Sequence, residues 1–471
     1  MAGMKRITQE TFDDVVKENE DEFEMEHQEA VEDAIKQFTS QGIDLTNIIT
    51  TFQGNNGGGN DDHKKPLLNA ISELSSALSA QPEDEQHVAS LLSTIRSKCE
   101  IDIAHRCYAG NNGAYPSLVL CCQKYSDNAA IFEQALETVT ALLTGQPDLV
   151  DSDFVEYLVK QLQLDKHAPD VVCQLLAVIT QSCIMHEANR QKFVSSALIP
   201  ALFNTMGAYG RVPMVVRSVC IAVKTLTLDD DIRVPFGKAH DTCRSIVEDA
   251  CSLDLLLNAA TEHRQDKETL AEVLGTLAIL AVRNEYCQHI VDMGGLKLCY
   301  SVLLDSIDDQ ILVKQAVNLI KAASGNDNVK DEVVKTGGVS LLLQVPNSHG
   351  GSTQLCECVC AALATLALRN PDHADLIVRA GGAEVVVQCM KNHPAHNGVQ
   401  KQACMALRNF VARVRQHKEH ILELGAESLL RRDLTLPSCQ DEAKAALRDL
   451  DCQVVLNEIW KGTGKELQRD Y

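Results

Sequence analysis

From about residue 65 onward, apolar residues recur at the three- and four-residue spacing of helices that bury one face. The clearest stretches predict long helices at 270–283, 313–324, 355–369 and 399–413. A shorter apolar helix is predicted before each of the last three, at 296–304, 339–345 and 383–390. Another short helix precedes each of these, and we expect Asn284, Asn326 and Asn370 to be its N-cap. The pattern predicts a repeat of three helices.

A glycine pair, or Gly-Ala in the last copy, separates the first and second helices of each repeat. Glycine ends a helix readily and lets the chain turn sharply, because it tolerates positive φ. Its first member recurs after 43, 44 and 44 residues, at positions 294, 337, 381 and 425. A period of this length predicts stacked helical repeats, since one repeat alone cannot cover its apolar face. The turn glycines are Gly294, Gly295, Gly337, Gly338, Gly381, Gly382 and Gly425.

The third helices can be aligned on one core residue each, which extends the repeat toward the N-terminus. The step of 54 residues between Val223 and Leu277 predicts an insertion around 236–254, where the glycine pair is also lost. Upstream of about residue 130 the pattern weakens, as expected of terminal repeats that present one face to water. The aligned core residues are Val139, Leu176, Val223, Leu277, Leu319, Leu363, Leu407 and Leu447.

The first fifty residues differ from the rest of the chain. Between Glu10 and Asp33 there are twelve acidic residues and one basic residue, Lys17. Apolar residues at helical spacing, such as Phe12 and Val16, nevertheless allow helices, so this composition fits either disorder or helices that form on docking. The predicted organisation is an acidic arm at 1–50, a Gly/Asn-rich linker at 51–64, a helical repeat array at 65–460 and a polar tail at 461–471.

Composition narrows the class of protein. Apolar residues make up 45% of the chain and aromatic residues only 4%, which suits helices packed through small side chains. The net charge of -22 argues against a nucleic-acid partner. No apolar run approaches the twenty residues of a membrane span, and the N-terminus has no apolar signal core. Eighteen cysteines without such a signal favour a reducing compartment, so we predict a cytosolic (cytoplasmic) protein and leave nuclear presence open. We also expect a monomer.

Three-helix repeats with glycines between the first and second helices resemble the armadillo repeat family. The Ala403-x-x-Ala406-Leu407-Arg408-Asn409 segment is similar to that family's third helix. The resemblance covers about 65–460 and is clearest over 270–450. It implies an all-α, right-handed α-solenoid whose concave groove, lined by third helices, holds extended peptides. In the import-adaptor branch the groove carries recurring Trp and Asn residues; here only Asn409 matches, so that branch is not predicted.

The predicted groove is more basic in its second half, which suggests an acidic ligand. Arg283, Arg369 and Arg413 each follow the aligned core residue by six positions, and Lys321 takes the Asn-equivalent position between the first two. Such a ladder of cations would clasp the acidic side chains of an extended peptide, with Asn409 binding its main chain. The alternative is that these cations only offset helix dipoles and face solvent.

Catalytic and metal-binding signatures are absent from the sequence. Cys356, Cys358 and Cys360 cannot converge on one ion from a helix, because each two-residue step turns the side chain by about 200°. We therefore predict no metal and no cofactor. No phosphate-binding loop, nucleophile elbow or zinc-protease motif occurs. An enzyme is not predicted; the alternative would place a site in the 231–254 insertion, with His240 and Cys243.

The sequence thus predicts a protein-binding scaffold or adaptor that holds an extended, acidic segment of a partner in its groove. A chaperone-like assembly factor that holds a client through apolar groove residues is the alternative. The two differ in their response to salt, which weakens a cation ladder but not apolar contacts. The acidic arm is itself a candidate ligand, because its tether would raise its local concentration.

Overall fold

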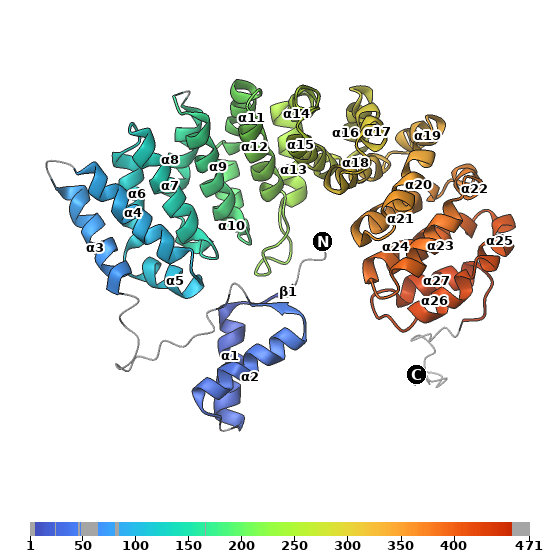
Figure 1. Ribbon diagram of the computed structural model, residues 1–471, viewed down its shortest axis with the longest axis horizontal. Helices are drawn as coiled ribbons and strands as arrows, with labels where there is room; N and C mark the ends of the chain where they lie inside the picture. The colour runs from blue at the N-terminus through green and yellow to red at the C-terminus, as the bar shows by residue number, and fades with distance from the viewer. Residues whose placement is uncertain are drawn as a thin grey trace, which may run out of the picture. The chain divides into compact units, whose positions relative to one another are not determined.

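The computed structural model describes residues 5–23, 25–45, 48, 65–80, 84–164 and 166–454. These residues are almost entirely helical (Figure 1). The chain divides into two compact units, Met1–Leu255 and Leu256–Tyr471, called unit 1 and unit 2 below. The predicted linker at 51–64 and the predicted tail at 461–471 lie outside the described residues. Among the helices that are described, none has both the length and the apolar character needed to cross a bilayer.

Unit 1 begins with two helices that share a small core. Phe12 and Phe38, whose ring centroids lie 6.0 Å apart, are buried there together with Val16, and Val31 and Ile35 pack against them. The helical spacing of these apolar residues in the sequence therefore corresponds to one buried face on each helix. Two short parallel strands pair Lys5 with Ile43. The elements are β1 (Lys5–Arg6), α1 (Gln9–Phe23), α2 (His27–Ser40) and β2 (Ile43–Asp44).

The rest of unit 1 is a stack of helices in which the longest pack side by side, α4 on α7, α7 on α9 and α9 on α12. Its first helices are α3 (Lys65–Ser79), α4 (Glu85–Cys99), α5 (Ile103–Asn111), α6 (Ala114–Lys124), α7 (Ala129–Leu143), η2 (Pro147–Leu149), α8 (Ser152–Gln163) and α9 (Pro169–Cys183). They are followed by α10 (Glu187–Ser195), α11 (Leu198–Tyr209), α12 (Pro213–Leu226), α13 (Ala239–Ala250) and α14 (Ser252–Glu262), the last of which crosses the boundary between the units.

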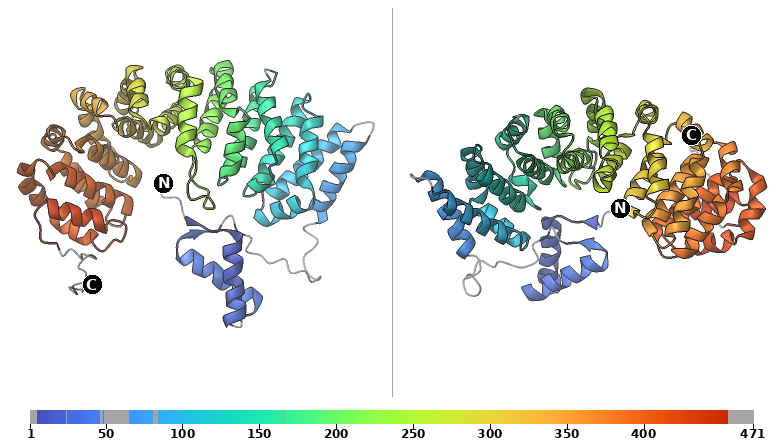
Figure 2. Two further views of the ribbon diagram at one scale, coloured as in Figure 1. Left: turned by 180° about the vertical axis from the view of Figure 1, so that it is seen from behind. Right: turned by 45° about the horizontal axis from the view of Figure 1, so that its top comes forward.

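Unit 2 repeats the three-helix pattern with few deviations, and Figure 2 shows its stacked helices from two further sides. Its third helices pack consecutively, α15 on α18, α18 on α21, α21 on α24 and α24 on α27. The elements are α15 (Lys267–Leu280), α16 (Asn284–Asp292), α17 (Gly295–Asp305), α18 (Gln310–Ala323), α19 (Asp327–Lys335), α20 (Gly338–His349), α21 (Thr353–Ala367), α22 (Pro371–Arg379), α23 (Gly382–Asn392), α24 (Asn397–Val411), η3 (Arg415–His417), α25 (Lys418–Glu423), α26 (Ala426–Asp433) and α27 (Gln440–Asp449).

The eight residues chosen to align the third helices are all core residues, with no more than 2% of their surface exposed. The predicted register is therefore confirmed. The helices themselves end earlier than predicted, at Leu280, Ala323, Ala367 and Val411. As a result Arg283, placed by the sequence pattern in the last turn of a third helix, lies beyond that turn.

The glycine turns behave as predicted, and unit 1 shows how the same turn is made without them. Gly294 has φ +92°, and a Cβ on Gly295 would lie only 2.7 Å from the Ile290 carbonyl oxygen, so both positions favour glycine. In unit 1 the break between α5 and α6 keeps a glycine, Gly113 at φ +84°, but the later breaks carry Ala197 at φ +61° and Cys251 at φ +47°. The turn therefore persists where the glycine pattern disappears, because a short strained residue can replace glycine at a modest cost in stability.

Two of the three predicted N-caps are confirmed. The Asn326 side chain accepts a hydrogen bond from the Asn328 amide, and that of Asn370 accepts one from the His373 amide. Asn284 is not a cap, because α16 starts one residue earlier than predicted and Arg283 occupies the N-cap position.

The position predicted for the insertion is also partly wrong. Helix α13, at Ala239–Ala250, is the first helix of a repeat, and the extra residues precede it at 227–238.

Candidate protein-binding face

The third helices of unit 2 expose one row of side chains away from the core. These side chains follow each aligned core residue by two positions, and two helical steps of 100° turn them well away from it. The row changes in character along the unit, from apolar through basic and neutral polar to acidic, and all its members are at least partly exposed. We call the row and its exposed neighbours on α15, α18, α21, α24 and α27 the third-helix face. Its members are Ile279, Lys321, Thr365, Asn409 and Asp449.

A pocket of about 270 Å³ opens on this face between α18, α21 and α24. It brings together two residues predicted from the sequence, Lys321 and Asn409. The small side chains of Ala361 and Ala364 leave its space free. We call it the α21–α24 pocket, and its full lining is Lys321, Ala361, Ala364, Thr365, Leu368, Gln402, Met405, Arg408 and Asn409.

The α21–α24 pocket combines apolar surface with polar groups that can still form a hydrogen bond or an ion pair with a ligand. Leu368 is 42% exposed and Met405 37%, both unusual for large apolar side chains. Asn409 donates through Nδ2 to the Ala364 carbonyl at 2.9 Å, which orients the amide and leaves its Oδ1 as an acceptor. Within the described part of the chain, Lys321 forms no ion pair. The pocket can therefore receive an apolar side chain beside a carboxylate and a main-chain amide.

Arg408 also lines the pocket, although the sequence analysis assigned it no role. Its Nε lies 3.2 Å from a carboxylate oxygen of Asp449, which occupies the equivalent row position on α27. Arg448 contacts the same carboxylate at 3.1 Å. Asp449 shows in this way how an acidic side chain is held against the face. The position of Arg408, directly after the core residue Leu407, was the sequence signal that could have identified it.

The other three predicted cations do not line this pocket. Arg283 is half-buried at the start of α16, 3.6 Å from Glu285 and 6.0 Å above the Tyr286 ring. Arg369 and Arg413 are exposed in the connections that follow α21 and α24. A continuous ladder of the four cations therefore remains a prediction, and the pocket itself contains Lys321 and Arg408.

Arg369 has a backbone conformation that is costly for its side chain. Its φ is +62°, in the left-handed region that glycine adopts most easily. We expect Arg369→Gly to raise the free energy of unfolding of unit 2 by about 0.5–1 kcal/mol, because the strain is relieved and no buried contact is lost. Urea unfolding followed by hydrogen exchange in α21 and α22 measures the change.

Arg413 is the matched control for this substitution, since it is also exposed and follows a third helix but has no positive φ. Arg413→Gly should leave stability unchanged or lower it, because glycine only adds freedom to the unfolded chain there. If both variants changed stability equally, backbone strain at Arg369 would not be the cause.

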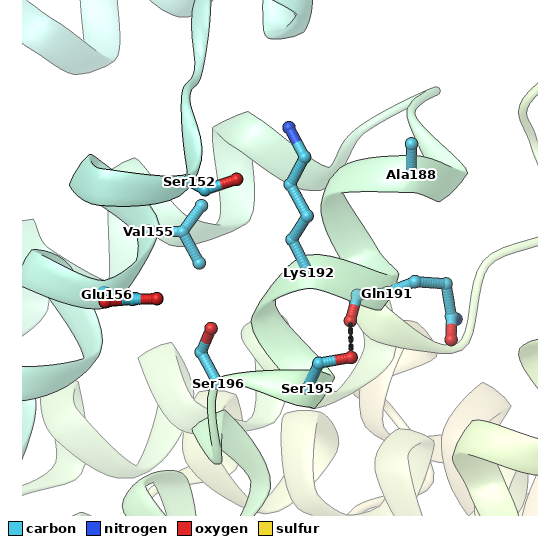
Figure 3. A pocket seen from close by; sticks show the side chains of 8 residues that line it. All are labelled: Ser152, Val155, Glu156, Ala188, Gln191, Lys192, Ser195 and Ser196. Atoms are coloured by element: carbon cyan, nitrogen blue, oxygen red, sulfur yellow. Dashed lines mark hydrogen bonds between the residues drawn. The ribbon is translucent and has the colours of Figure 1, made fainter.

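A second surface depression, of about 520 Å³, lies between α8 and α10 in unit 1 (Figure 3). Its polar groups are largely satisfied within the chain. Lys192 donates to the Val150 carbonyl at 3.3 Å, and Ser195 donates to the Gln191 carbonyl at 2.8 Å. Val155 is its one large apolar side chain. The depression therefore offers a ligand fewer unsatisfied polar groups and less apolar surface than the α21–α24 pocket does.

The residues considered for catalysis and metal binding have other environments. His240 is exposed, whereas Cys243 is buried, and this burial raises the pKa of its thiol to about 11. A thiol with that pKa is protonated at neutral pH and is a poor nucleophile. Burial likewise raises the pKa of the Cys358 thiol. Among the described residues, no three His, Cys, Asp or Glu side chains are placed to hold a metal ion.

Comparison with known proteins matches almost the whole chain. The armadillo repeat-containing protein 6 N-terminal domain matches residues 4–66, and the ARMC6 family matches residues 67–468. Armadillo repeat-containing protein 6 of Homo sapiens and that of Pongo abelii are each 44% identical over 469 residues, 97% of this chain and 93% of theirs. The Drosophila melanogaster homolog is 40% identical over 469 residues, 98% of this chain and 99% of its own.

Solved structures share the fold at low sequence identity. An engineered protein aligns with a TM-score of 0.66 and 20% identity, covering 93% of this chain and 98% of its own. A structure from work on the interaction between cadherin and β-catenin aligns with a TM-score of 0.56 and 16% identity, covering 81% and 68%. The fold is an all-α solenoid of armadillo-type repeats, and the chain belongs to the armadillo repeat-containing protein 6 family.

Proposed function

We propose that the third-helix face of unit 2 binds an extended, acidic segment of a partner protein, so that the chain works as a scaffold or adaptor. The armadillo-repeat family and its solenoid neighbours fit a protein-interaction scaffold, and proteins of this family are typically non-catalytic. The observation that carries the proposal is the α21–α24 pocket, where Lys321 and Asn409 meet beside exposed apolar side chains.

The mode of binding follows from the chemistry of the face. A carboxylate of the ligand would pair with Lys321, in the way that Asp449 pairs with Arg408. Asn409 Oδ1 would accept a hydrogen bond from a main-chain amide of the ligand. Arg369 and Arg413, exposed after their third helices, would contact acidic residues further along the same segment. Each exposed contact of this kind contributes about 0.2–1 kcal/mol, so affinity would arise from several modest contacts.

Exposed apolar residues support a second candidate, a chaperone-like factor that holds a client through apolar contacts. Ile279 and Val282 are 38% and 40% exposed, and Leu368 and Met405 are similarly exposed in the α21–α24 pocket. Such binding would persist at high salt, whereas pairing with carboxylates would weaken as the ionic strength rises.

A random-peptide display library, selected on the intact chain, tests the proposal without a known partner. Selected peptides should be acidic. Their affinity should fall by about tenfold or more in a variant with four charge reversals, since Lys321, Arg369 and Arg413 would each lose an exposed pair that contributes about 0.5 kcal/mol or more. Fluorescence anisotropy at several salt concentrations measures the change. The variant carries Arg283→Glu, Lys321→Glu, Arg369→Glu and Arg413→Glu.

A matched variant carries the same change in net charge away from the third helices. Its four positions are exposed on α17, α19, α22 and α26, and it should bind the selected peptides almost as well as the parent chain. Equal loss in both variants would indicate a general charge effect and contradict the proposed site. Selected peptides that are apolar, salt-insensitive and lost with Met405→Glu would instead favour the chaperone-like function. The matched variant carries Lys297→Glu, Lys335→Glu, Arg379→Glu and Arg431→Glu.

A further inference from the structure

The insertion at 227–238 in unit 1 is held firmly, although it has no regular secondary structure. Arg190, with 1% of its side chain exposed, donates to Asp230 at 2.6 Å. Arg233 lies 2.9 Å from Asp231 and 3.0 Å from Asp148, which lies in the η2 turn after α7. The insertion is therefore attached both to the end of α9 and α10 and to the repeat before them.

These attachments persist at neutral pH. Burial raises the pKa of Asp231, but hydrogen bonds from the Arg233 side chain and from the amide of Glu187 outweigh it, and the net shift is downward. The pKa of Asp148 is lowered in the same way, by His186 and Arg233 against the effect of burial. Both carboxylates are thus ionised and bound to their partners.

The fixed insertion presents apolar side chains that stay partly exposed beside residues 7–10. Ile232 is 55% exposed and Leu228 is 37% exposed. Ile232 and Arg233 line a pocket of about 730 Å³, together with Ile184 and Met185 at the end of α9. The pocket extends to the end of α7 and to Arg106 on α5, so it follows the ends of three successive long helices, α7, α9 and α12. We call this surface the helix-end edge.

The other wall of the same pocket comes from the start of the chain, residues 7–10. Ile7 is half-buried and also packs against the Phe12–Phe38 core, so this segment belongs to the folded N-terminal region. Glu10 and Arg106 line the same pocket, whereas the charge of Arg233 is offset within the edge by Asp148 and Asp231. The Nε of Arg106 is buried and has no hydrogen-bond partner among the described residues.

We propose that residues 7–10 are the built-in occupant of the helix-end edge, and that their release exposes a second protein-binding surface in unit 1. This edge is separate from the third-helix face of unit 2, so the inference does not depend on the proposed function. The N-terminal region would thereby act as an internal competitor for any partner that recognises the edge, and a partner able to displace it would present apolar side chains at the contact.

Site-specific photocrosslinking in the full chain tests this assignment. The photoreactive amino acid p-benzoylphenylalanine replaces Gln9, which lines the pocket, and the dilute monomer is irradiated. Mass spectrometry should find intramolecular crosslinks to Ile184, Met185 or Ile232. The same group in place of Gln37, exposed on α2 and not part of the pocket, is the control and should give no crosslinks to these residues.

A second variant separates docking from chance proximity. Ile232→Asp changes an exposed residue, so the fold should persist, but it removes apolar contact and adds a negative charge to the pocket that Glu10 also lines. The crosslink yield from position 9 should then fall several-fold, while circular dichroism stays unchanged. Crosslinks confined to α1 and α2, crosslinks only between chains, or a yield unaffected by Ile232→Asp would each overturn the proposal.

Discussion

Arg190→Ala is expected to lower the free energy of local unfolding around α9 and α10 by about 3–5 kcal/mol, because it leaves the buried carboxylate of Glu187 and the partly buried one of Asp230 without their counter-charge. The Arg190 side chain is 1% exposed and donates to Glu187 at 2.8 Å and to Asp230 at 2.6 Å. It also donates to the Cys183 carbonyl at 2.9 Å, so α9 would lose a partner at its last residue. Native-state hydrogen exchange of the amides in α9 and α10 measures the loss.

The same substitution should loosen the insertion at 227–238, because Asp230 is one of its attachments. Its Oδ2 accepts from the Met185 amide at 3.1 Å, a bond that depends on the carboxylate staying in place. Arg244→Ala is the matched control in unit 1, since Arg244 pairs with Glu248 at 3.3 Å while half of its side chain is exposed. Its effect should stay within about 0.5 kcal/mol. If Arg190→Ala lowered the free energy of local unfolding by less than about 1 kcal/mol, water would have replaced the guanidinium, and the site would be accessible to solvent.

Gly382→Ala is expected to destabilise unit 2 by about 1–3 kcal/mol through overpacking in the turn between α22 and α23. A Cβ at this position would lie 2.5 Å from Ile377 Cγ2 and 2.8 Å from the Ile377 carbonyl oxygen. Ile377 is fully buried, so neither its side chain nor the helix backbone can move away without disturbing the core. Urea unfolding of the full chain, with hydrogen exchange assigned to α22 and α23, measures the cost.

Gly351→Ala provides the comparison, because the added Cβ would meet no atom within 4 Å and the residue has no positive φ. Its effect should lie within about 0.5 kcal/mol. Similar losses in the two variants would mean that backbone freedom, rather than close packing against Ile377, is what glycine supplies at position 382.

Several features of the protein could be predicted from its sequence because they depend on short-range periodicity. The eight aligned core residues were identified correctly, since the buried face of an amphipathic helix can be recognised from the spacing of its apolar residues. The glycine turns of unit 2 were equally visible, because positive φ and close packing both select glycine. A family resemblance followed from the same residues, and with it the fold class.

Other features depended on contacts between residues far apart in the chain. Residues 184 and 185, after α9, lie beside Arg233 only because the repeats stack; nothing in their local sequence indicates it. The repeat breaks at Ala197 and Cys251 were hidden because tertiary packing tolerates strain that sequence propensity would not predict.

The candidate site was likewise predictable in part from local periodicity and in part only from the tertiary structure. Periodicity placed Lys321 and Asn409 on one helical face, because side-chain direction follows from position along a helix. Which of the predicted cations meet in one pocket was decided by the tertiary structure, which brings Lys321 and Arg408 together and leaves Arg369 and Arg413 in the connections. The sequence alone therefore determined the repeat and its faces, since both follow from local helix geometry. Tertiary packing decided the helix ends and the pocket, since both depend on neighbouring repeats.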